Sequence, residues 1–264
     1  MENKIRMIIT DMDGSLLNNE GKMTEYSSDI LNRCIQNGII VVFATARPLR
    51  GVEIFYDSIM PDAVICYNGA TVYVNEKKIY QCGIRTKIAK RLIKDIMEKF
   101  PNAKLAIDAN NQLYTNFDAS TLWGDIDFKK MDIETLPKTK IDKIIIKFGS
   151  IDETNGLIRY LPRHLYLEIS ERGLGIIMNR GATKWNAIEE LLKYYNIGQR
   201  NTIAFGDDYN DLEMVKYCGT GVAMKNGIDE IKAVAKYVCE VNSENGIAKW
   251  INENILMGAR YGKY

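Results

Sequence analysis

The stretch Met7-Ile8-Ile9-Thr10-Asp11-Met12-Asp13-Gly14 begins with an apolar, largely β-branched run and ends in two carboxylates and a glycine. The apolar run does not alternate with polar residues, which is typical of a strand covered on both faces in a parallel sheet. Ligands of open parallel sheets bind at the carboxyl ends of the strands. The stretch therefore predicts a buried strand that carries Asp11 and Asp13 to a binding site.

Two similar apolar runs, at 39–44 and 63–67, follow along the chain. Apolar residues at helical spacing predict helices at 26–37 and 49–56 between these runs. The same alternation returns near the C-terminus, where we expect helices at 184–195, 210–217, 228–234 and 247–254 and strands at 202–205, 220–223 and 237–241. Strands that alternate with helices in this way are typical of an α/β fold with a doubly wound, mainly parallel sheet.

The middle of the chain, at 81–180, follows a different pattern. We expect helices at 87–100 and 154–160 and short strands at 104–108, 112–115, 143–148, 165–169 and 175–178. Asn110-Asn111 and Arg172-Gly173 separate neighbouring strands and predict β-hairpins, and hence an antiparallel sheet. We therefore expect one discontinuous α/β domain made of 1–80 and 181–264, interrupted by an inserted α+β domain at 81–180.

The composition of the chain restricts the classes of function. The 264 residues include 35 Lys and Arg against 34 Asp and Glu, a formal net charge of +1, so we expect neither a nucleic-acid nor a membrane partner. The single histidine, His164, excludes most zinc sites and Ser-His triads. Five cysteines without a Cys-x-x-Cys pair, and no visible secretory signal, indicate a reducing compartment, so we expect a cytoplasmic protein.

The two carboxylates after the first predicted strand suit two kinds of chemistry. Asp11 and Asp13 stand at i and i+2, and carboxylate oxygens are ligands that Mg²⁺ prefers. Asp11 is also placed to attack a phosphoryl group and form an aspartyl phosphate, while Asp13 protonates the leaving oxygen and then activates water. The alternative for this segment is an ordinary strand-to-turn cap, since Asp and Gly are common turn residues.

Three more polar clusters follow predicted strands or begin a predicted helix. Thr45 and the backbone around Ala46 precede a helix and are suited to hold phosphate, or they simply cap that helix. Lys184 begins a helix, where its charge opposes the macrodipole, so it either neutralises a carboxylate nucleophile or is a solvated surface lysine. The run Gly206-Asp207-Asp208-Tyr209-Asn210-Asp211 holds three carboxylates whose mutual repulsion a cation or a lysine would relieve.

Within this last run, Asp207 stands nearest the strand end and is the expected further metal ligand. Asn210 is placed to reach a substrate oxygen, and Asp211 to orient a lysine or a metal-bound water; the alternative is an acidic surface loop. The carboxyl ends of adjacent parallel strands meet at one edge of a sheet. We expect these side chains to converge at that edge: Asp11, Asp13, Thr45, Lys184 and Asp207.

The clusters together resemble the four motifs of the haloacid dehalogenase superfamily: Asp11-Met12-Asp13-Gly14-Ser15, Ala44-Thr45-Ala46-Arg47-Pro48, the helix of Lys184, and the run at 206–211. Their order and the place of the insertion are similar to the Cof-type branch, which carries a large α+β cap of type IIB. The resemblance implies a Rossmann-like core sheet and a Mg²⁺-dependent phosphatase. Its substrate would be a small phosphorylated metabolite, a sugar phosphate foremost, hydrolysed through an aspartyl phosphate.

The resemblance also implies a role for each matching residue. Asp11 would be the nucleophile and Asp13 the general acid and base, with Lys184 beside them. The implied metal ligands are the Asp11 carboxylate, the Asp13 backbone carbonyl and Asp207. Asp208 and Asp211 would support these ligands without binding the metal themselves. The implied phosphate contacts are the backbone of Met12 and Ala46 and the side chains of Thr45, Lys184 and Asn210.

The chain departs from the family pattern at two positions. Ser15 stands where the family usually has Thr and keeps the hydroxyl, whereas Ala46 replaces the usual Gly and its methyl group disfavours a positive φ. Asn68 lies in a segment that resembles the family's Asn-Gly-Ala stretch, so it is expected either to contact the substrate or to be a turn residue. Arg47 is expected either to bind substrate anions or to be solvated at the start of a helix.

Two other functions fit the same motifs. A phosphomutase would transfer the same phosphoryl group to a sugar hydroxyl in place of water, and a regulator would bind a phosphorylated metabolite without catalysis. An intact set of Asp11, Asp13 and Lys184 argues against the regulator. The sequence leaves the oligomeric state and the physiological ester open.

Overall fold

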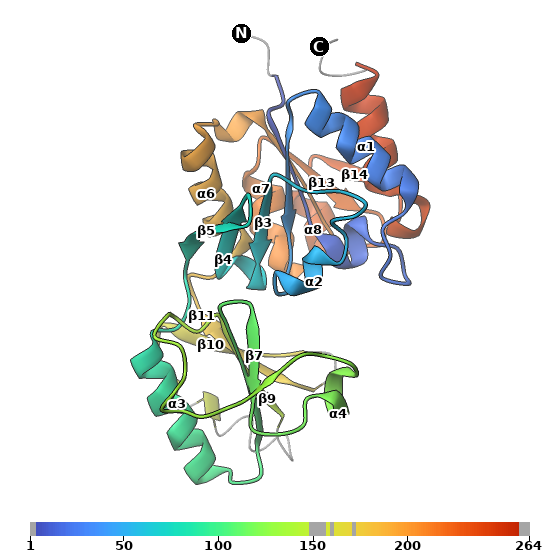
Figure 1. The fold of residues 1–264 in the computed structure, drawn as a ribbon. Coiled ribbons are helices and arrows are strands. Elements are labelled where there is room, and N and C mark those ends of the chain that lie inside the picture. The colour runs from blue at the N-terminus through green and yellow to red at the C-terminus, as the bar shows by residue number, and fades with distance from the viewer. Residues whose placement is uncertain (1–3, 148–156, 159–160, 171–172, 259–264) are drawn as a thin grey trace. The chain divides into compact units, whose positions relative to one another are not determined.

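The computed structural model describes residues 4–147, 157–158, 161–170 and 173–258, so most of the predicted helix at 154–160 lies outside the described residues. The chain forms two compact units (Figure 1). One consists of Met1–Tyr80 and Thr183–Tyr264, and the other of Gln81–Ala182. Each unit has its own sheet and its own apolar core.

The first unit is built on an eight-stranded sheet in the order β14-β13-β12-β1-β2-β3-β4-β5 (Figure 1). The strands from β14 to β3 pair in parallel, whereas β4 is antiparallel to β3. The predicted α/β class with a mainly parallel sheet is therefore confirmed. The strands are β1 (Met7–Thr10), β2 (Ile40–Ala44), β3 (Ala63–Cys66), β4 (Thr71–Val74), β5 (Lys77–Gln81), β12 (Thr202–Gly206), β13 (Thr220–Met224) and β14 (Tyr237–Cys239).

The strands β4 and β5 were not predicted, although the buried residues of β4, Thr71–Val74, carry a local strand pattern. The first three residues of β5 are exposed, so this strand has no apolar run that would mark it in the sequence. The turn between the two strands consists of Asn75 and Glu76, both with positive φ, and Glu is not a residue that indicates such a turn. The sheet predicted from the sequence therefore ends at β3 and lacks the hairpin of β4 and β5.

Helices pack against the sheet of the first unit and form its core. Met7 and Ile9 of β1 belong to the same buried cluster as Ile188 of α6. The alternate residues of a strand point to the other face, where the ring of Phe205 packs edge-on against Trp250 of α9, with centroids 5.4 Å apart. The helices are α1 (Glu25–Gln36), α2 (Arg50–Glu53), α6 (Lys184–Tyr195), α7 (Leu212–Tyr217), α8 (Asp229–Val234) and α9 (Gly246–Ile251).

Local capping fixes where α6 begins, and this matters because Lys184 is its first residue. The hydroxyl of Thr183 accepts a hydrogen bond from the backbone N–H of Asn186 at 3.2 Å, which satisfies one free donor of the first turn. At the other end, Asn196 takes the left-handed conformation that terminates helices. The start and end expected from the sequence, 184–195, match the helix in the structure.

The second unit is built on a six-stranded sheet in the order β10-β11-β9-β6-β7-β8. The predicted hairpins are confirmed, because β6 pairs antiparallel with β7 and β10 pairs antiparallel with β11. The 14-residue helix α3 buries Leu92, Ile93 and Ile96 against this sheet. The elements are α3 (Thr86–Lys99), α4 (Ser120–Trp123), β6 (Lys104–Ala109), β7 (Gln112–Thr115), β8 (Lys129–Lys130), β9 (Lys143–Lys147), β10 (Leu165–Ile169) and β11 (Gly175–Asn179). Across the described residues, every helix is too short or too polar to cross a lipid bilayer.

The packing of α7 onto the sheet predicts a strong effect of one added methyl group. A Cβ atom at Gly221 in β13 would lie 1.9 Å from the backbone oxygen of Val215 in α7, so Gly221→Ala must push the helix away from the sheet. We expect a loss of about 3 kcal/mol in the free energy of unfolding, the upper end for overpacking. Denaturant-induced unfolding measures this loss.

The matched control is Gly38→Ala. A Cβ at Gly38 would meet nothing within 4 Å, but the backbone φ there is +75°, so this variant carries only the conformational cost of about 1 kcal/mol. Equal losses in the two variants would show that contact between α7 and β13 does not limit the size of residue 221.

Candidate active site

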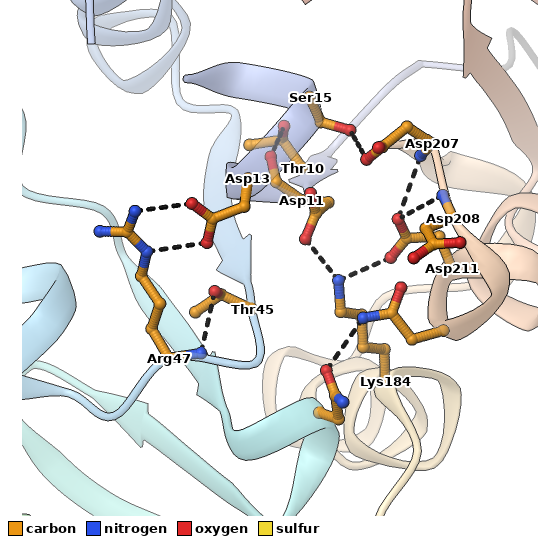
Figure 2. A network of polar contacts seen from close by, with 12 residues as sticks. Thr10, Asp11, Asp13, Ser15, Thr45, Arg47, Lys184, Asp207, Asp208 and Asp211 are labelled. Carbon is orange, nitrogen blue, oxygen red and sulfur yellow. Dashed lines mark hydrogen bonds and ion pairs between the residues drawn. The ribbon is translucent and has the colours of Figure 1, made fainter. Parts of the chain in front are cut away.

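A buried lysine joins two carboxylates at the carboxyl end of the core sheet (Figure 2). Lys184 Nζ donates to Asp11 Oδ1 at 2.5 Å and to Asp211 Oδ1 at 2.6 Å. Asp11 follows β1, Lys184 begins α6, and Asp211 ends the turn that follows β12. All three are almost completely buried, with 5%, 1% and 0% of their surfaces exposed. The lysine is therefore an internal counter-ion and not a solvated surface residue.

Asp207 lies beside this group and is held by a hydroxyl. Ser15 Oγ donates to Asp207 Oδ1 at 2.7 Å, although the two residues are 192 positions apart. Gly14 allows the approach, because it has a φ of +82° and a Cβ there would lie 2.3 Å from Asp207 Oδ2. Ser15, which stands in place of the family's usual Thr, thus supplies the hydroxyl that orients Asp207.

Two carboxylates of the acidic turn after β12, Asp208 and Asp211, have different contacts. Asp208 is exposed and caps the turn, accepting a hydrogen bond from the backbone N–H of Tyr209 at 2.8 Å. Asp211 points inward, where its Oδ2 accepts from the backbone N–H groups of Asp207 at 3.1 Å and Asp208 at 3.4 Å. Asp211 therefore holds the turn with one oxygen and Lys184 with the other.

Burial shapes the protonation of these groups. Burial raises the pKa of the Asp11 carboxyl well above its usual value, Lys184 opposes this shift, and the nearby Asp211 and Asp207 carboxylates add to it. Burial alone would lower the pKa of Lys184, but Asp11 and Asp211 outweigh it and raise that pKa. Burial also raises the pKa of Asp207 to about 6, against the hydrogen bond from Ser15. The site thus concentrates more negative charge than one lysine compensates.

A divalent cation fits this excess of negative charge. Asp11, Asp207 and Asp211 each offer a carboxylate oxygen, and these three oxygens lie within 4.8 Å of one another. Asp11 Oδ2 is buried and has no hydrogen-bond partner among the residues that the structure describes. An acceptor buried without a partner is costly, and a bound cation would satisfy it. Carboxylate oxygens are the donor set of a hard cation such as Mg²⁺.

The carboxylate of Asp13 points away from this cluster and pairs with Arg47 (Figure 2). Arg47 Nη2 lies 2.6 Å from Asp13 Oδ1, and the Asp13 side chain is 53% exposed. Thr45 is fully buried, and its hydroxyl accepts the backbone N–H of Arg47 at 3.1 Å. Asp11 and Asp13 are therefore two residues apart in the chain but have different partners.

Four further residues were predicted to contact the substrate: Met12, Ala46, Asn68 and Asn210. Met12 is fully buried, and Ala46 is exposed at the end of β2. Ala46 has no positive φ, so its methyl group causes no backbone strain of the kind expected from the sequence. Asn210 Nδ2 donates to Asn68 Oδ1 at 3.0 Å, which brings the segments after β12 and β3 together.

The turn Tyr67–Gly69 after β3 is strained and packs against the start of α6. Tyr67 and Asn68 both have a φ of 51°, which is rare for a bulky residue such as Tyr. Gly69 has a φ of +103°, and a Cβ there would lie 2.0 Å from the backbone oxygen of Thr183. Strain of this kind persists where packing enforces it, often near functional sites. The turn fits closely against the residue that precedes Lys184.

Sequence reasoning missed one support of the site. Asn226 Nδ2 donates to the backbone oxygen of Gly14 at 2.8 Å and so holds the turn that carries Asp11 and Asp13. The Asn226 side chain accepts in return from the backbone N–H of Asn242 at 3.0 Å. Asn226 was not among the predicted residues, because nothing in its local sequence shows a partner 212 positions away.

Comparisons with known proteins show the family and the fold of the chain. A family model described as haloacid dehalogenase-like hydrolase matches residues 8–251. The 5-amino-6-(5-phospho-D-ribitylamino)uracil phosphatase YitU of Bacillus subtilis (strain 168) is 26% identical over 267 residues, covering 96% of this chain and 98% of the relative.

Two solved structures share the fold. TM0651 from Thermotoga maritima is 24% identical with a TM-score of 0.85, covering 96% of this chain and 98% of the other. The HAD subclass IIB sugar phosphatase BT4131 is 22% identical with a TM-score of 0.77, covering 94% and 98%. Since the family model spans nearly the whole sequence, the resemblance seen in the four motifs is confirmed, and the chain belongs to the haloacid dehalogenase-like hydrolases.

Proposed function

We propose that this protein is a Mg²⁺-dependent phosphatase that hydrolyses small phosphate monoesters through an aspartyl phosphate on Asp11. The observation that carries the proposal is the buried group of Asp11, Lys184 and Asp211, in which one Asp11 oxygen is paired and the other has no partner among the described residues. A carboxylate held rigidly by a lysine at the end of a parallel strand is suited to act as a nucleophile. The family membership and the phosphatase names of relatives support the same conclusion.

The residues that would hold Mg²⁺ are the Asp11 carboxylate, Asp207 and the backbone carbonyl of Asp13. Asp211 has a carboxylate oxygen close to those of Asp11 and Asp207 and would support these two ligands, while Asp208 caps the turn that carries Asp207. When bound, the ion would neutralise phosphate charge and fix the phosphoryl group in front of the nucleophile. Lys184 would offset the remaining charge between Asp11 and the incoming dianion.

In the first half-reaction, Asp11 attacks phosphorus, so a new bond forms from its carboxylate oxygen while the bond to the ester oxygen breaks. Asp13 donates a proton to that leaving oxygen. The Thr45 hydroxyl and the backbone N–H groups of Met12 and Ala46 would hold the phosphoryl oxygens, and Asn210 and Asn68 would contact the substrate. These contacts stabilise charge where it develops in the transition state.

In the second half-reaction, Asp13 takes a proton from water as the water oxygen bonds to phosphorus. The bond between phosphorus and Asp11 then breaks, and inorganic phosphate is released. Because Asp11 is buried, access of bulk water to the aspartyl phosphate is restricted. The same carboxylate of Asp13 thus serves as acid first and as base second.

The substrate class that we propose is a phosphorylated sugar or polyol. One structural neighbour is named a sugar phosphatase, and the relative YitU acts on a phosphorylated ribityl compound by its name. We assign 1–80 and 181–264 to the catalytic core and 81–180 to the inserted α+β cap of the family. All five cysteines are free thiols, which supports a cytoplasmic location.

Replacing the nucleophile tests the covalent step directly. Asp11→Asn keeps the size and polarity of the side chain but removes the carboxylate, so turnover of phosphate esters should fall by about 10³-fold or more. Acid-quenched wild-type enzyme should carry one phosphoryl group on the peptide with Asp11, by mass spectrometry, and the variant none. Inorganic phosphate should be the product, without a stoichiometric sugar bisphosphate.

Asp29→Asn is the matched control, because Asp29 is exposed on α1 and away from the site. It should keep wild-type turnover. A phosphorylated Asp11→Asn variant, or one with full turnover, would rule out Asp11 as the nucleophile.

Metal binding has a readout that does not depend on activity. A ligand that binds only the folded state stabilises it by about 2.7 kcal/mol at 100 times its Kd, so Mg²⁺ should raise the thermal midpoint of the wild-type protein. Asp207→Asn should remove most of this shift. Asp208→Asn should keep it, because the neighbouring side chain only caps the turn and Asn also caps well. Equal shifts in both variants would contradict the assignment of Asp207.

A further inference from the structure

Arg47 contacts Asp13 through two parallel hydrogen bonds (Figure 2). Its Nε donates to Asp13 Oδ2 at 2.8 Å, and its Nη2 donates to Asp13 Oδ1 at 2.6 Å. A fork of this kind between a guanidinium and a carboxylate fixes both the plane and the direction of the carboxylate. The sequence left open whether Arg47 binds substrate anions or water, and the structure shows that it binds a neighbouring side chain.

Arg47 is the better anchored member of this pair. Its Nη1 donates to the backbone oxygen of Gly51 at 3.3 Å, and its guanidinium carbon lies 5.6 Å from the centre of the Phe55 ring. The Arg47 side chain is 25% exposed, against 53% for Asp13. The arginine therefore keeps its place without Asp13, whereas Asp13 takes its orientation from the arginine.

Within the described residues, the Asp13 carboxylate accepts hydrogen bonds from Arg47 alone. Asp13 has a φ of −80° and a ψ of 120°, so the backbone leaves helical geometry at this residue. A half-exposed side chain on a turn would otherwise occupy several rotamers. Loss of the fork would therefore leave the carboxylate without a fixed direction.

The fork does not prevent proton transfer. A carboxylate has about four lone-pair sites, and the two hydrogen bonds from Arg47 occupy one on each oxygen. Each oxygen keeps another lone pair, and the fork fixes its direction. A general acid and base needs such an oxygen, able to hold a proton at a constant position relative to the reacting atoms.

We propose that Arg47 is a positioning residue for proton transfer and directs the Asp13 carboxyl toward the ester oxygen and then toward water. The inference rests on the proposed function. In the first step the proton moves from Asp13 to the ester oxygen as the Asp11–phosphorus bond replaces the ester bond. In the second step a water proton moves to Asp13 as the water–phosphorus bond replaces the Asp11–phosphorus bond.

Leaving groups of different basicity test this role. Phenolate is a poor leaving group and needs a proton, whereas 2,4-dinitrophenolate leaves without one. We would measure single-turnover rates of phenyl phosphate and 2,4-dinitrophenyl phosphate, which probe the first step with leaving groups of similar shape. Arg47→Met should slow the phenyl ester by about 10²-fold, the lower range of general acid catalysis. Its loss on the dinitrophenyl ester should be at least about tenfold smaller.

Further variants separate positioning from other roles. Arg47→Lys keeps the charge and loses the fork, so it should behave more like Arg47→Met than like the wild type. In an Asp13→Asn background, Arg47→Met should cause no further change in the ratio of the two rates, because the group that it positions is gone. Arg200→Met makes the same change at an exposed arginine outside the site and should leave both rates unchanged.

Three outcomes would overturn the inference. Equal losses on both esters with a raised KM would show that Arg47 binds the phosphate, and full recovery by Arg47→Lys would show that charge alone matters. Wild-type rates in Arg47→Met would show that the pair has no part in catalysis. If the wild-type enzyme turns over neither ester with Mg²⁺ present, the proposed function fails before the question about Arg47 arises.

Discussion

The site depends on one ammonium group placed between two carboxylates inside the protein. Taking three charges out of water is costly, and the cost is recovered only where the geometry is good and the remaining hydrogen-bonding capacity is used. Lys184 satisfies this condition with two short contacts, and Asp211 uses its second oxygen on the backbone of its own turn. Removing one member of such a group typically costs about 3–5 kcal/mol, because it leaves a buried charge unpaired. Stability and the chemistry that we propose therefore constrain the same three residues.

This constraint explains why the discontinuous unit needs both of its segments. Asp11 comes from the first segment, whereas Lys184 and Asp211 come from the second. The register of the sheet brings them together, since Thr10 of β1 lies beside Phe205 of β12 and the polar residues follow both strands. The strained turn at Tyr67–Gly69 packs against the start of α6, because Gly69 lies directly against the backbone of Thr183. The pairing of β1 with β12 thus places Asp11, and the packing of Gly69 on Thr183 lies next to Lys184.

Much of the fold follows from the sequence, because buried parallel strands and amphipathic helices leave strong local patterns. The run at 7–10 and the helix at 184–195 are examples in which pattern and structure agree closely. Apart from the buried strand β4, what the sequence missed lacks a local pattern. The exposed strand β5 has no apolar run, and Asn226 shows its role only through a partner 212 positions away. The convergence of Asp11, Lys184 and Asp207 could be predicted because each residue follows a recognisable strand or begins a recognisable helix.

The sequence could not show that Asp11 and Asp13, the two carboxylates of the first motif, pair with different residues. Residues at i and i+2 of an extended strand point the same way, but the extended conformation ends at Asp11 and a helical turn, Met12–Leu16, begins directly after it. Asp11 is then buried against Lys184, and Asp13 is left at the surface of the site beside Arg47. A nucleophile benefits from burial, since desolvation and a fixed counter-ion hold it in place, whereas a group that exchanges protons with water must stay accessible. The different exposures of the two side chains, 7% for Asp11 and 53% for Asp13, match the two roles that we propose for them.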